Sequence, residues 1–312
     1  MSTHTTSITL DHEIVIVGSG FSGLGAGIQL KKMGLDNFVI LERANDLGGT
    51  WRDNTYPGLT VDVASTSYSY GFELSPEWTR LYAPGAQVKA YADHCAQKYG
   101  LAAHLRYGCA VVGATYSEAS NTWTTELADG RRLVSRYLVS ATGLFGPPKL
   151  PTIPGVESFA GKLMHTAQWD HSYDFSDKRV AVIGTGATAI QVIPEIVEQL
   201  AHLDIYQRTP IWLLPKPDLA ISETARARFR RFPVLQRLAR YATNALNEVL
   251  FGIGFSHFRQ VPALFRWLEK VGVRHIRKQV TDPRLQEKLI PRYSFFCKRP
   301  SFSNTYFPVF NR

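Results

Sequence analysis

A glycine-rich turn near the start of the chain limits its possible folds more than any other feature. The run GSGFSG at residues 18–23 lies between a β-branched stretch, Glu13–Val17, and a helix-like stretch, Leu24–Met33. A second strand is predicted over Asn37–Leu41. This strand–turn–helix–strand order is typical of a parallel α/β fold whose helix N-terminus faces the phosphates of a dinucleotide. The alternative is a glycine-rich structural turn without a ligand.

The residues of this turn have separate physical roles. Gly18 permits the tight turn, Gly20 lets the backbone approach a pyrophosphate, and Gly23 lets helix and strand pack closely. Glu42 follows the second strand near the offset at which such folds hydrogen-bond a ribose hydroxyl. With Phe21, these residues form the first predicted cofactor site.

A second unit of the same kind begins with the strand Arg179–Ile183 and continues with a helix, Ile190–Leu200, and a strand, Leu203–Gln207. That strand ends in Arg208 and Thr209 instead of an acid. An arginine suits the 2′-phosphate of NADP, which an acid would repel. The alternative is that Arg208 is a solvated strand-end charge. The cofactor contacts predicted on this turn and helix are Gly184, Thr185, Gly186, Ala187, Thr188 and Gln191.

Between the two units the sequence predicts a small antiparallel meander. Its strands are Ala110–Tyr116, Thr122–Leu127 and Arg132–Val139, with a turn at Asp129-Gly130. Val111, near its start, is included among the predicted cofactor contacts. Two dinucleotide folds imply two cofactors. The predicted fold class is therefore α/β, with two Rossmann-like domains that bind FAD and NADPH.

The charge of the chain is concentrated near its end. Residues 219–312 hold 18 Lys+Arg and 5 Asp+Glu, a net charge of +13, against −4 for residues 1–218. The stretches 225–250, 258–278 and 282–288 are helical in pattern, with basic residues among apolar ones. We favour solvated faces of a helical insertion over a membrane-surface helix. Nucleic acid ranks last, because no nucleic-acid-binding motif accompanies the charge.

Other features exclude several classes of protein. Cys95, Cys109 and Cys297 form neither a CxxC pair nor an even disulfide framework. The N-terminus lacks the basic and apolar regions of a signal peptide. No apolar stretch reaches the roughly 20 residues of a membrane span. We expect a cytoplasmic protein with reduced thiols and no metal site.

Two longer signatures resemble the Baeyer–Villiger monooxygenase family. The pattern F-x-G-x-x-x-H-x-x-x-W-[PD] is met by Phe159, Gly161, His165 and Trp169. The pattern [AG]-G-x-W-x-x-x-x-[FY]-P-[GM]-x-x-x-D is met by residues 48–62. Related amine- and sulfide-oxidising enzymes share the glycine turns but usually lack the tryptophan. The cofactor contacts predicted in the second signature are Gly49, Thr50, Trp51, Tyr56 and Asp62.

The resemblance implies an FAD- and NADPH-dependent monooxygenase that inserts one atom of O₂ into a ketone through a C4a-peroxyflavin, giving an ester or lactone. The family's Lys-Arg-Pro arginine lies beside flavin and nicotinamide, so the resemblance assigns that catalytic place to Arg299. It also assigns Asp62 as the partner of Arg299, and Lys298 as a ligand of the NADP phosphate together with Arg208 and Thr209. Taken alone, Arg299 could be a solvated charge and Asp62 a turn or cap residue.

Other assignments keep alternatives. In the family, the counterparts of His165 and Trp169 lie between the domains and affect coupling; a packed linker would have the same pattern. Trp51 and Tyr56 are expected at the flavin wall, or simply in a loop with an aromatic anchor. Gln191 is either a bond to the nicotinamide side or an ordinary helix-surface residue.

The resulting plan has an FAD domain at 1–155, an NADPH domain at 156–218, a helical insertion at 219–290 and a return to the NADPH domain at 291–312. Family members are longer, so we expect the C-terminal part that closes the flavin site to be missing. Three alternatives stay open: an S- or N-oxidising flavin monooxygenase, a flavin oxidase or disulfide reductase, and a truncated nucleotide-binding flavoprotein without turnover. The absence of a CxxC motif argues against the reductase.

Overall fold

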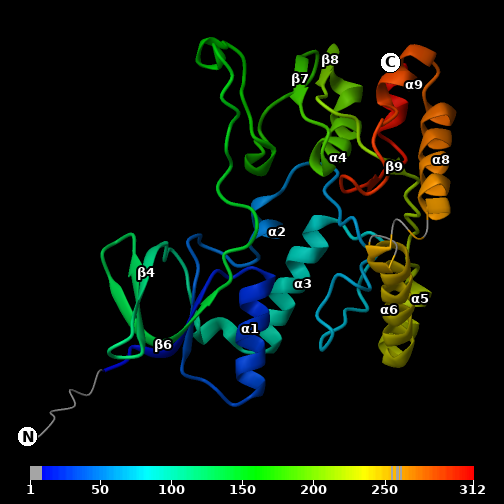
Figure 1. The fold of residues 1–312 in the computed structure, drawn as a ribbon. Helices are drawn as coiled ribbons and strands as arrows, with labels where there is room; N and C mark the ends of the chain where they lie inside the picture. The colour runs from blue at the N-terminus through cyan, green and yellow to red at the C-terminus, as the bar shows by residue number, and fades with distance from the viewer. Residues whose placement is uncertain (1–8, 254–255, 258–259, 261) are drawn as a thin grey trace, which may run out of the picture. The chain divides into compact units, whose positions relative to one another are not determined.

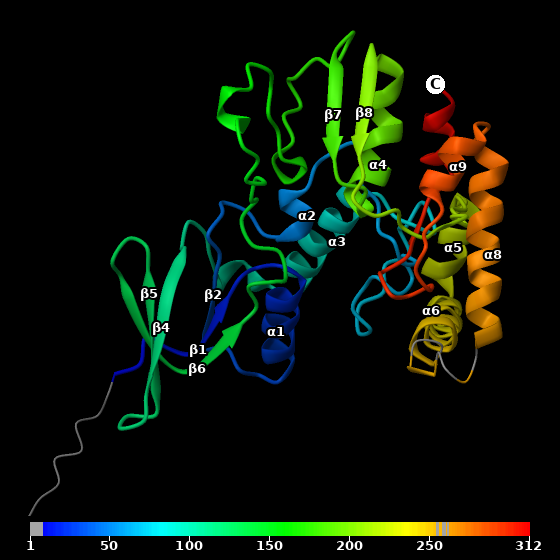
Figure 2. The ribbon, with the colours of Figure 1, turned by 45° about the horizontal axis from the view of Figure 1, so that its top comes forward.

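The computed structural model describes residues 9–253, 256–257, 260 and 262–312. The N-terminal residues 1–8, on which the signal-peptide expectation partly depends, and the predicted helix start at Phe258 lie outside this part. The chain forms two compact units (Figures 1 and 2). Unit 1 comprises Met1–Thr55 and Ala86–Ala167, and unit 2 comprises Tyr56–Gly85 and Gln168–Arg312.

Unit 1 is built on a six-stranded sheet with the strand order β3-β2-β1-β6-β5-β4. Strands β3, β2, β1 and β6 run parallel, and β5 and β4 extend the sheet as an antiparallel meander. Strands β1, β2, β4, β5 and β6 match the prediction, whereas the two-residue β3 was not predicted. Their bounds are β1 (His12–Val17), β2 (Phe38–Leu41), β3 (Leu105–Arg106), β4 (Val111–Ser117), β5 (Thr122–Leu127) and β6 (Arg132–Ser140).

Helix α1 (Phe21–Lys32) follows β1 directly and begins three residues before the predicted start. It packs closely on β2, because a Cβ added at Gly27 would come within 2.9 Å of the Ile40 side chain. The short helix α2 (Thr50–Asp53) and the longer α3 (Gly85–Lys98) complete the helices of this part of the chain. The strand–turn–helix–strand unit predicted from the first glycine run is thus confirmed.

Unit 2 contains the second such unit. Strands β7 (Arg179–Ile183) and β8 (His202–Tyr206) pair in parallel, with α4 (Ala187–Ile196) between them in the sequence. A separate parallel pair joins β9 (Leu213–Leu214) to β10 (Ser301–Phe302). The return of the chain near residue 300 therefore lies beside the segment that follows β8.

The basic region is helical, as predicted, but its first helix is divided. Pro233 lacks a backbone N–H and suits the first turn of a helix, so a new helix starts there. Among the described residues, no helix is both long and apolar enough to cross a bilayer. The elements are α5 (Glu223–Arg231), α6 (Pro233–Asn247), the π-helical turn η5 (Glu248–Ile253), α8 (Pro262–Gln279) and α9 (Pro283–Leu289).

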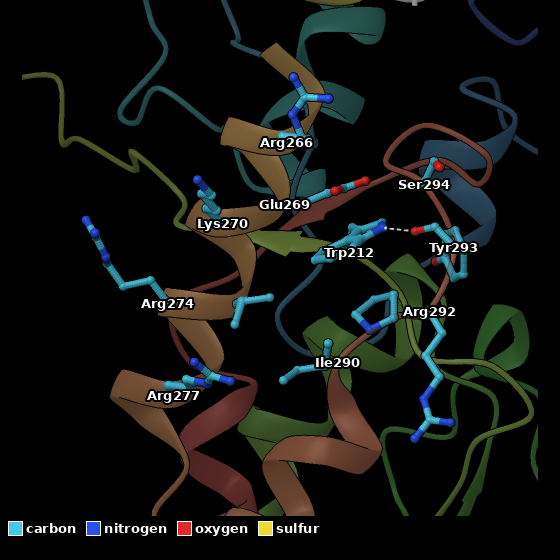
Figure 3. Close-up of a pocket in the computed structure, with 12 residues that line it drawn as sticks. Trp212, Arg266, Glu269, Lys270, Arg274, Arg277, Ile290, Arg292, Tyr293 and Ser294 are labelled. Atoms are coloured by element: carbon cyan, nitrogen blue, oxygen red, sulfur yellow. Dashed lines mark hydrogen bonds between the residues drawn. The ribbon is translucent and has the colours of Figure 1, made fainter. Parts of the chain in front are cut away.

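A groove of about 810 Å³ lies beside α8 in unit 2 (Figure 3). Neither Asp62 nor Arg299 lines it. The acid in its wall, Glu269, accepts a hydrogen bond from the backbone N–H of Phe295 at 3.0 Å. Its basic lining residues are Arg266, Lys270, Arg274, Arg277 and Arg292.

The segment Tyr56–Gly85 departs from the linear division of the chain at residue 155, because it packs in unit 2. A bridge between Thr60 and Pro84 closes the segment on itself. Ion pairs then tie it to the basic region: Arg80 lies 2.9 Å from Asp218, and Glu77 lies 2.6 Å from Arg230. Residues 1–155 therefore do not form one compact body.

Candidate functional site

The first glycine turn is too crowded for side chains at two of its positions and open at the third. Gly18 has a φ of +102°, and a Cβ there would lie 2.5 Å from the carbonyl oxygen of Ala141. A Cβ on Gly23 would lie 1.9 Å from the carbonyl oxygen of Gly18. At Gly20 the nearest atom, the Cα of Gly49, is 3.8 Å away. The turn thus leaves an open cradle at the N-terminus of α1.

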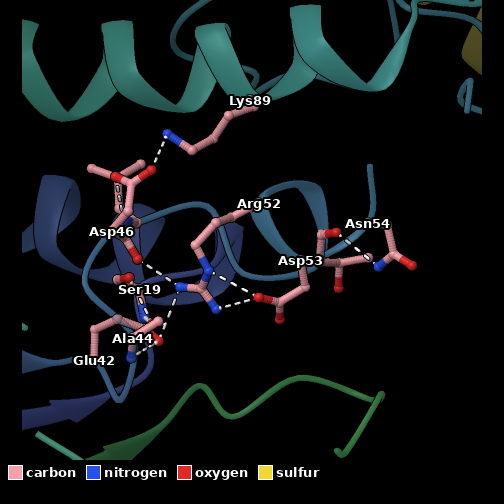
Figure 4. A network of polar contacts seen from close by, with 10 residues as sticks. Ser19, Glu42, Ala44, Asp46, Arg52, Asp53, Asn54 and Lys89 are labelled. Atoms are coloured by element: carbon pink, nitrogen blue, oxygen red, sulfur yellow. Dashed lines mark hydrogen bonds and ion pairs between the residues drawn. The ribbon is translucent and has the colours of Figure 1, made fainter. Parts of the chain in front are cut away.

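Glu42, at the end of β2, is buried, and both of its carboxylate oxygens are engaged (Figure 4). Oε2 accepts the backbone N–H of Ser19 at 3.0 Å and the Ser19 hydroxyl at 2.7 Å. Oε1 accepts the N–H of Ala44 at 3.0 Å and lies 3.0 Å from Nη1 of Arg52. Glu42 therefore stabilises the glycine turn. These contacts were not predicted from its position in the sequence, which indicates a ribose hydroxyl as its partner.

The sequence analysis missed Arg52. Besides Glu42, its guanidinium binds the carboxylate of Asp53 at 2.7 Å and the carbonyl oxygen of Asp46 at 2.6 Å. Lys89 on α3 lies 2.9 Å from the Asp46 carboxylate, so the network reaches α3 (Figure 4). The available signal for Arg52 was an arginine inside the glycine-rich signature, directly before the acid Asp53.

These contacts make the stability of unit 1 depend on pH. Burial alone would raise the pKa of Glu42, but hydrogen bonds from Ala44 and Ser19 and the charge of Arg52 outweigh burial and lower it. A carboxyl group whose pKa is lowered by folding stabilises the folded protein at pH values above its ordinary pKa of 4.5. This stability is lost as the pH falls through and below 4.5. We expect Glu42→Gln to destabilise the protein by about 1–3 kcal/mol at pH 7.

Thermal melts of wild type and Glu42→Gln from pH 7 to pH 3 measure this effect. The difference in Tm should shrink as the pH falls, because the wild-type carboxylate is then protonated as well. Glu118→Gln, an exposed acid on the same unit, is the matched control and should change Tm little. A difference in Tm that is constant with pH would contradict the assignment to a charged Glu42.

Of the remaining residues predicted on the flavin side, Phe21, Gly49, Thr50, Trp51 and Val111 lie in unit 1, whereas Tyr56 lies in unit 2. Thr50 and Trp51 begin α2. The ring of Phe21 stacks on Tyr91 with centroids 6.0 Å apart. Val111 begins β4 and packs, partly buried, against the core of the sheet. That core consists of Val15, Val39, Leu41, Cys109 and Leu127.

The second glycine turn, in unit 2, is open at both glycines. A Cβ on Gly184 or Gly186 would meet no heavy atom within 4 Å, although Gly184 has a φ of +105°. Thr185 between them is buried. Arg208, after β8, is exposed and has no hydrogen bond or ion pair to the described part of the chain. The turn therefore leaves space for a pyrophosphate beside its backbone, and the unpaired guanidinium of Arg208 can bind a further phosphate.

Lys298 is linked to the segment that follows β8 through Tyr293. Its ammonium lies 5.2 Å from the centre of the Tyr293 ring. The Tyr293 hydroxyl donates to the carbonyl oxygen of Pro210 at 2.9 Å, and the indole N–H of Trp212 donates to the Tyr293 carbonyl oxygen at 2.9 Å (Figure 3). These contacts tie Lys298 to Pro210 and Trp212, in the segment that begins two residues after Arg208.

Asp62 and Arg299 form an ion pair within unit 2. Nη2 of Arg299 lies 2.5 Å from Oδ2 of Asp62, although 237 positions separate them in the sequence. The Arg299 side chain is 76% exposed and the Asp62 side chain 27%. An ion pair this exposed adds little to stability. Its guanidinium retains N–H donors for another partner.

Gln191 on α4 holds the second signature instead of standing free on the helix surface. Its Oε1 accepts the Tyr56 hydroxyl at 3.1 Å, and its Nε2 donates to the Thr60 carbonyl oxygen at 3.1 Å. Gly58 permits this approach, because a Cβ there would lie 2.6 Å from the Gln191 carbonyl oxygen. Burial raises the pKa of Tyr56, which favours the neutral hydroxyl as the donor.

Lys216 is a second residue that the sequence analysis missed. Its ammonium donates to the Thr60 hydroxyl at 2.8 Å and lies 5.0 Å from the centre of the Tyr82 ring. Its backbone carbonyl and N–H both bind the side chain of Asn304. Burial lowers the pKa of Lys216, while the charge of Asp218 acts in the opposite direction. A lysine between two prolines after an apolar strand was the available signal.

The predicted fingerprint lies where the chain passes from unit 1 to unit 2, at Ala167. Trp169 stacks on Phe175 with ring centroids 5.3 Å apart and packs against the α4 core. Nδ1 of His165 accepts a backbone N–H two residues on, at 3.1 Å. Phe159 is exposed, and its ring lies over Gly161, where a Cβ would approach it to 2.5 Å.

A family model described as pyridine nucleotide-disulphide oxidoreductase matches residues 15–250. A Baeyer–Villiger monooxygenase of Pseudomonas aeruginosa is 44% identical over 310 residues, and one of Streptomyces coelicolor is 41% identical over 296. The chain belongs to the Baeyer–Villiger branch of this family. The matches cover 99% and 95% of this chain, but only 58% and 56% of the two relatives. The chain thus spans little more than half their length.

Solved structures agree with this placement. A crystal structure of OTEMO in complex with FAD and NADP matches with a TM-score of 0.85 and 28% identity, over 98% of this chain and 64% of that one. An oxidized steroid monooxygenase bound to NADP matches with a TM-score of 0.84 and 29% identity, over 96% and 64%. The predicted fold class, α/β with Rossmann-type domains, is confirmed.

Proposed function

We propose that this chain is the cofactor-binding part of a monooxygenase that inserts one oxygen atom of O₂ into a ketone to give an ester or lactone. The observation that carries the proposal is the ion pair of Asp62 and Arg299. It joins the end of the second family signature to the Lys-Arg-Pro step, and it leaves the cation exposed to a ligand.

The cofactors of the proposed enzyme are FAD and NADPH. The open cradle at Gly20 and the N–H groups at the start of α1 fit a flavin pyrophosphate, and the open turn at Gly184 and Gly186 fits that of NADPH. Arg208 and Lys298, with Thr209, would bind the 2′-phosphate. When bound, NADPH supplies the electrons and FAD the activation of O₂.

The contribution of Arg299 is a fixed positive charge. A guanidinium stays protonated at any working pH, so it can stabilise negative charge on oxygen throughout the reaction. Asp62 holds the guanidinium in one orientation and offsets part of its charge. Gln191 and Lys216 hold the loop that carries Asp62, because both bind Thr60, two residues earlier.

The test is product analysis on the purified chain loaded with FAD. NADPH oxidation is followed with cyclic and linear ketones under ¹⁸O₂, and products are identified by mass spectrometry. An ester or lactone carrying one ¹⁸O atom supports the proposal. Sulfoxide or N-oxide formation without any ester would point to another flavin monooxygenase, and hydrogen peroxide alone would point to an oxidase.

A separate prediction concerns the choice of nicotinamide cofactor. We expect Arg208→Ala to weaken NADPH binding by roughly tenfold or more and to leave NADH binding unchanged, because only NADPH carries the 2′-phosphate. Titration of both cofactors against the FAD-loaded protein measures the two Kd values. Arg179→Ala, another exposed arginine of unit 2, is the control. Equal losses for both cofactors would exclude the assigned contact.

A further inference from the structure

One face of helix α6 bonds to the protein through polar side chains. Gln236 is only 4% exposed and donates to the carbonyl oxygen of Ser75. Arg240, one turn later, donates to the carbonyl oxygens of Thr66 at 3.0 Å and Ser69 at 3.0 Å. The hydroxyl of Thr243, one turn further, lies 3.3 Å from that of Thr66. Polar bonds therefore fix this helix on residues 66–75 of unit 2.

The opposite face of α6 is apolar and exposed. Leu238 and Leu246 are each 58% exposed, and Tyr241 between them is 70% exposed. Spacings of three and eight residues from Leu238 place Tyr241 and Leu246 on its side of the helix, because a turn takes about 3.6 residues. Most surface helices show the reverse arrangement, with the apolar stripe on the core. The full stripe, continued into η5, is Val234, Leu235, Leu238, Tyr241, Leu246 and Val249.

Cations border this stripe, and the one carboxylate in its sequence, residues 234–249, is Glu248 at its C-terminal end. Residues 225–247 contain no Asp or Glu. Arg231 and Arg237 are exposed and have no ion pair to the described part of the chain. The sequence that follows, residues 249–258, is VLFGIGFSHF, with no Lys, Arg, Asp or Glu. Apolar residues flanked by arginines are suited to the interface of a lipid bilayer, where acyl chains lie below anionic headgroups.

We propose that α6 docks on an anionic lipid bilayer, lying in the plane of the interface with Leu238, Tyr241 and Leu246 among the acyl chains. Arg231 and Arg237 then contact lipid phosphates. An acidic protein partner would match the arginines but not the apolar stripe between them. The inference does not depend on the proposed oxygenation, because it rests only on the outward face of α6. The sequence alone favoured solvated faces of a helical insertion over a membrane-surface helix. The exposed apolar stripe of α6 favours the membrane-surface helix instead.

Vesicle flotation of the intact chain tests the proposal. We expect binding to mixed phosphatidylcholine–phosphatidylglycerol vesicles, weaker binding to pure phosphatidylcholine, and a decrease as salt is added. Leu238→Glu should lower the partition coefficient of the protein into anionic vesicles roughly tenfold or more. One apolar side chain is lost from the bilayer, and the new carboxylate is repelled by the anionic headgroups. Leu219→Glu is the matched control, because Leu219 is 67% exposed and lies outside α6.

A second variant keeps the test independent of charge. Tyr241→Trp should give a blue-shifted emission, quenched by brominated lipid, when vesicles are added, relative to wild type under the same conditions. Absence of binding to anionic vesicles would overturn the proposal, as would binding that Leu238→Glu leaves unchanged. A concentration-dependent dimer that Leu238→Glu abolishes, without vesicle binding, would assign the face to a second copy instead. Circular dichroism checks that each variant is folded.

Discussion

Replacing Arg299 with alanine is expected to reduce ester formation by roughly 10²–10³-fold, the usual effect of removing one donor that stabilises a developing oxyanion. FAD content and fold should be unchanged, because the side chain is 76% exposed and its only described partner is Asp62. Product formation under saturating NADPH, alongside the visible spectrum of bound flavin, measures the two effects separately.

Two further variants sharpen this expectation. Arg299→Lys keeps the charge but loses the planar set of donors, so it should recover only part of the rate. Arg292→Ala removes an exposed arginine from the same basic stretch and should leave the rate close to wild type, as it lies outside the pair with Asp62. Equal activity of Arg299→Ala and wild type would remove Arg299 from the reaction.

The second large effect is expected at the first glycine turn, where alanine at Gly23 and alanine at Gly20 should have different consequences. Gly23→Ala places a Cβ 1.9 Å from the Gly18 carbonyl oxygen, so strand and helix must separate. We expect several kcal/mol of destabilisation, comparable to severe overpacking, or no folded protein. Gly20→Ala meets no atom nearer than 3.8 Å and should fold normally, yet its methyl group occupies the cradle proposed for the flavin pyrophosphate.

The contrast is measured by thermal melts and by FAD titration of the apoprotein. Gly20→Ala should keep its Tm and lose FAD affinity by roughly tenfold or more, since the backbone can no longer approach the phosphates. Gly146→Ala, at a glycine with open space and no positive φ, is the control for both measurements. If Gly20→Ala binds FAD as wild type does, the flavin site lies elsewhere.

Local patterns explain how much of the fold could be predicted. Apart from the short β3, the strands of unit 1, α1, and the β7–α4–β8 unit follow from β-branched runs, glycine turns and apolar spacing, which act over a few residues. The pairing of Asp62 with Arg299 came from a family resemblance, and the structure places the two in contact. No spacing rule connects residues so far apart in the sequence.

The features that were missed depend on tertiary contacts. The offset of Glu42 predicts a ribose contact, which stays a prediction; its bonds to Ser19 and Arg52 were not predicted, because they arise only when the turn and α2 fold against β2. The apolar residues of α6 would ordinarily predict a buried face. That face is exposed because Gln236 and Arg240, on the other face, donate hydrogen bonds to backbone carbonyl oxygens of residues 66–75. This segment is distant from α6 in the sequence.

The passage of the chain from unit 1 to unit 2 at Thr55-Tyr56 falls inside the second signature. Gly49 and Trp51 belong to one body, while Tyr56 and Asp62 belong to the other, fastened there by Gln191. Any displacement of unit 2 as a body would therefore carry Asp62 and Arg299 together, because both residues belong to it and are paired there.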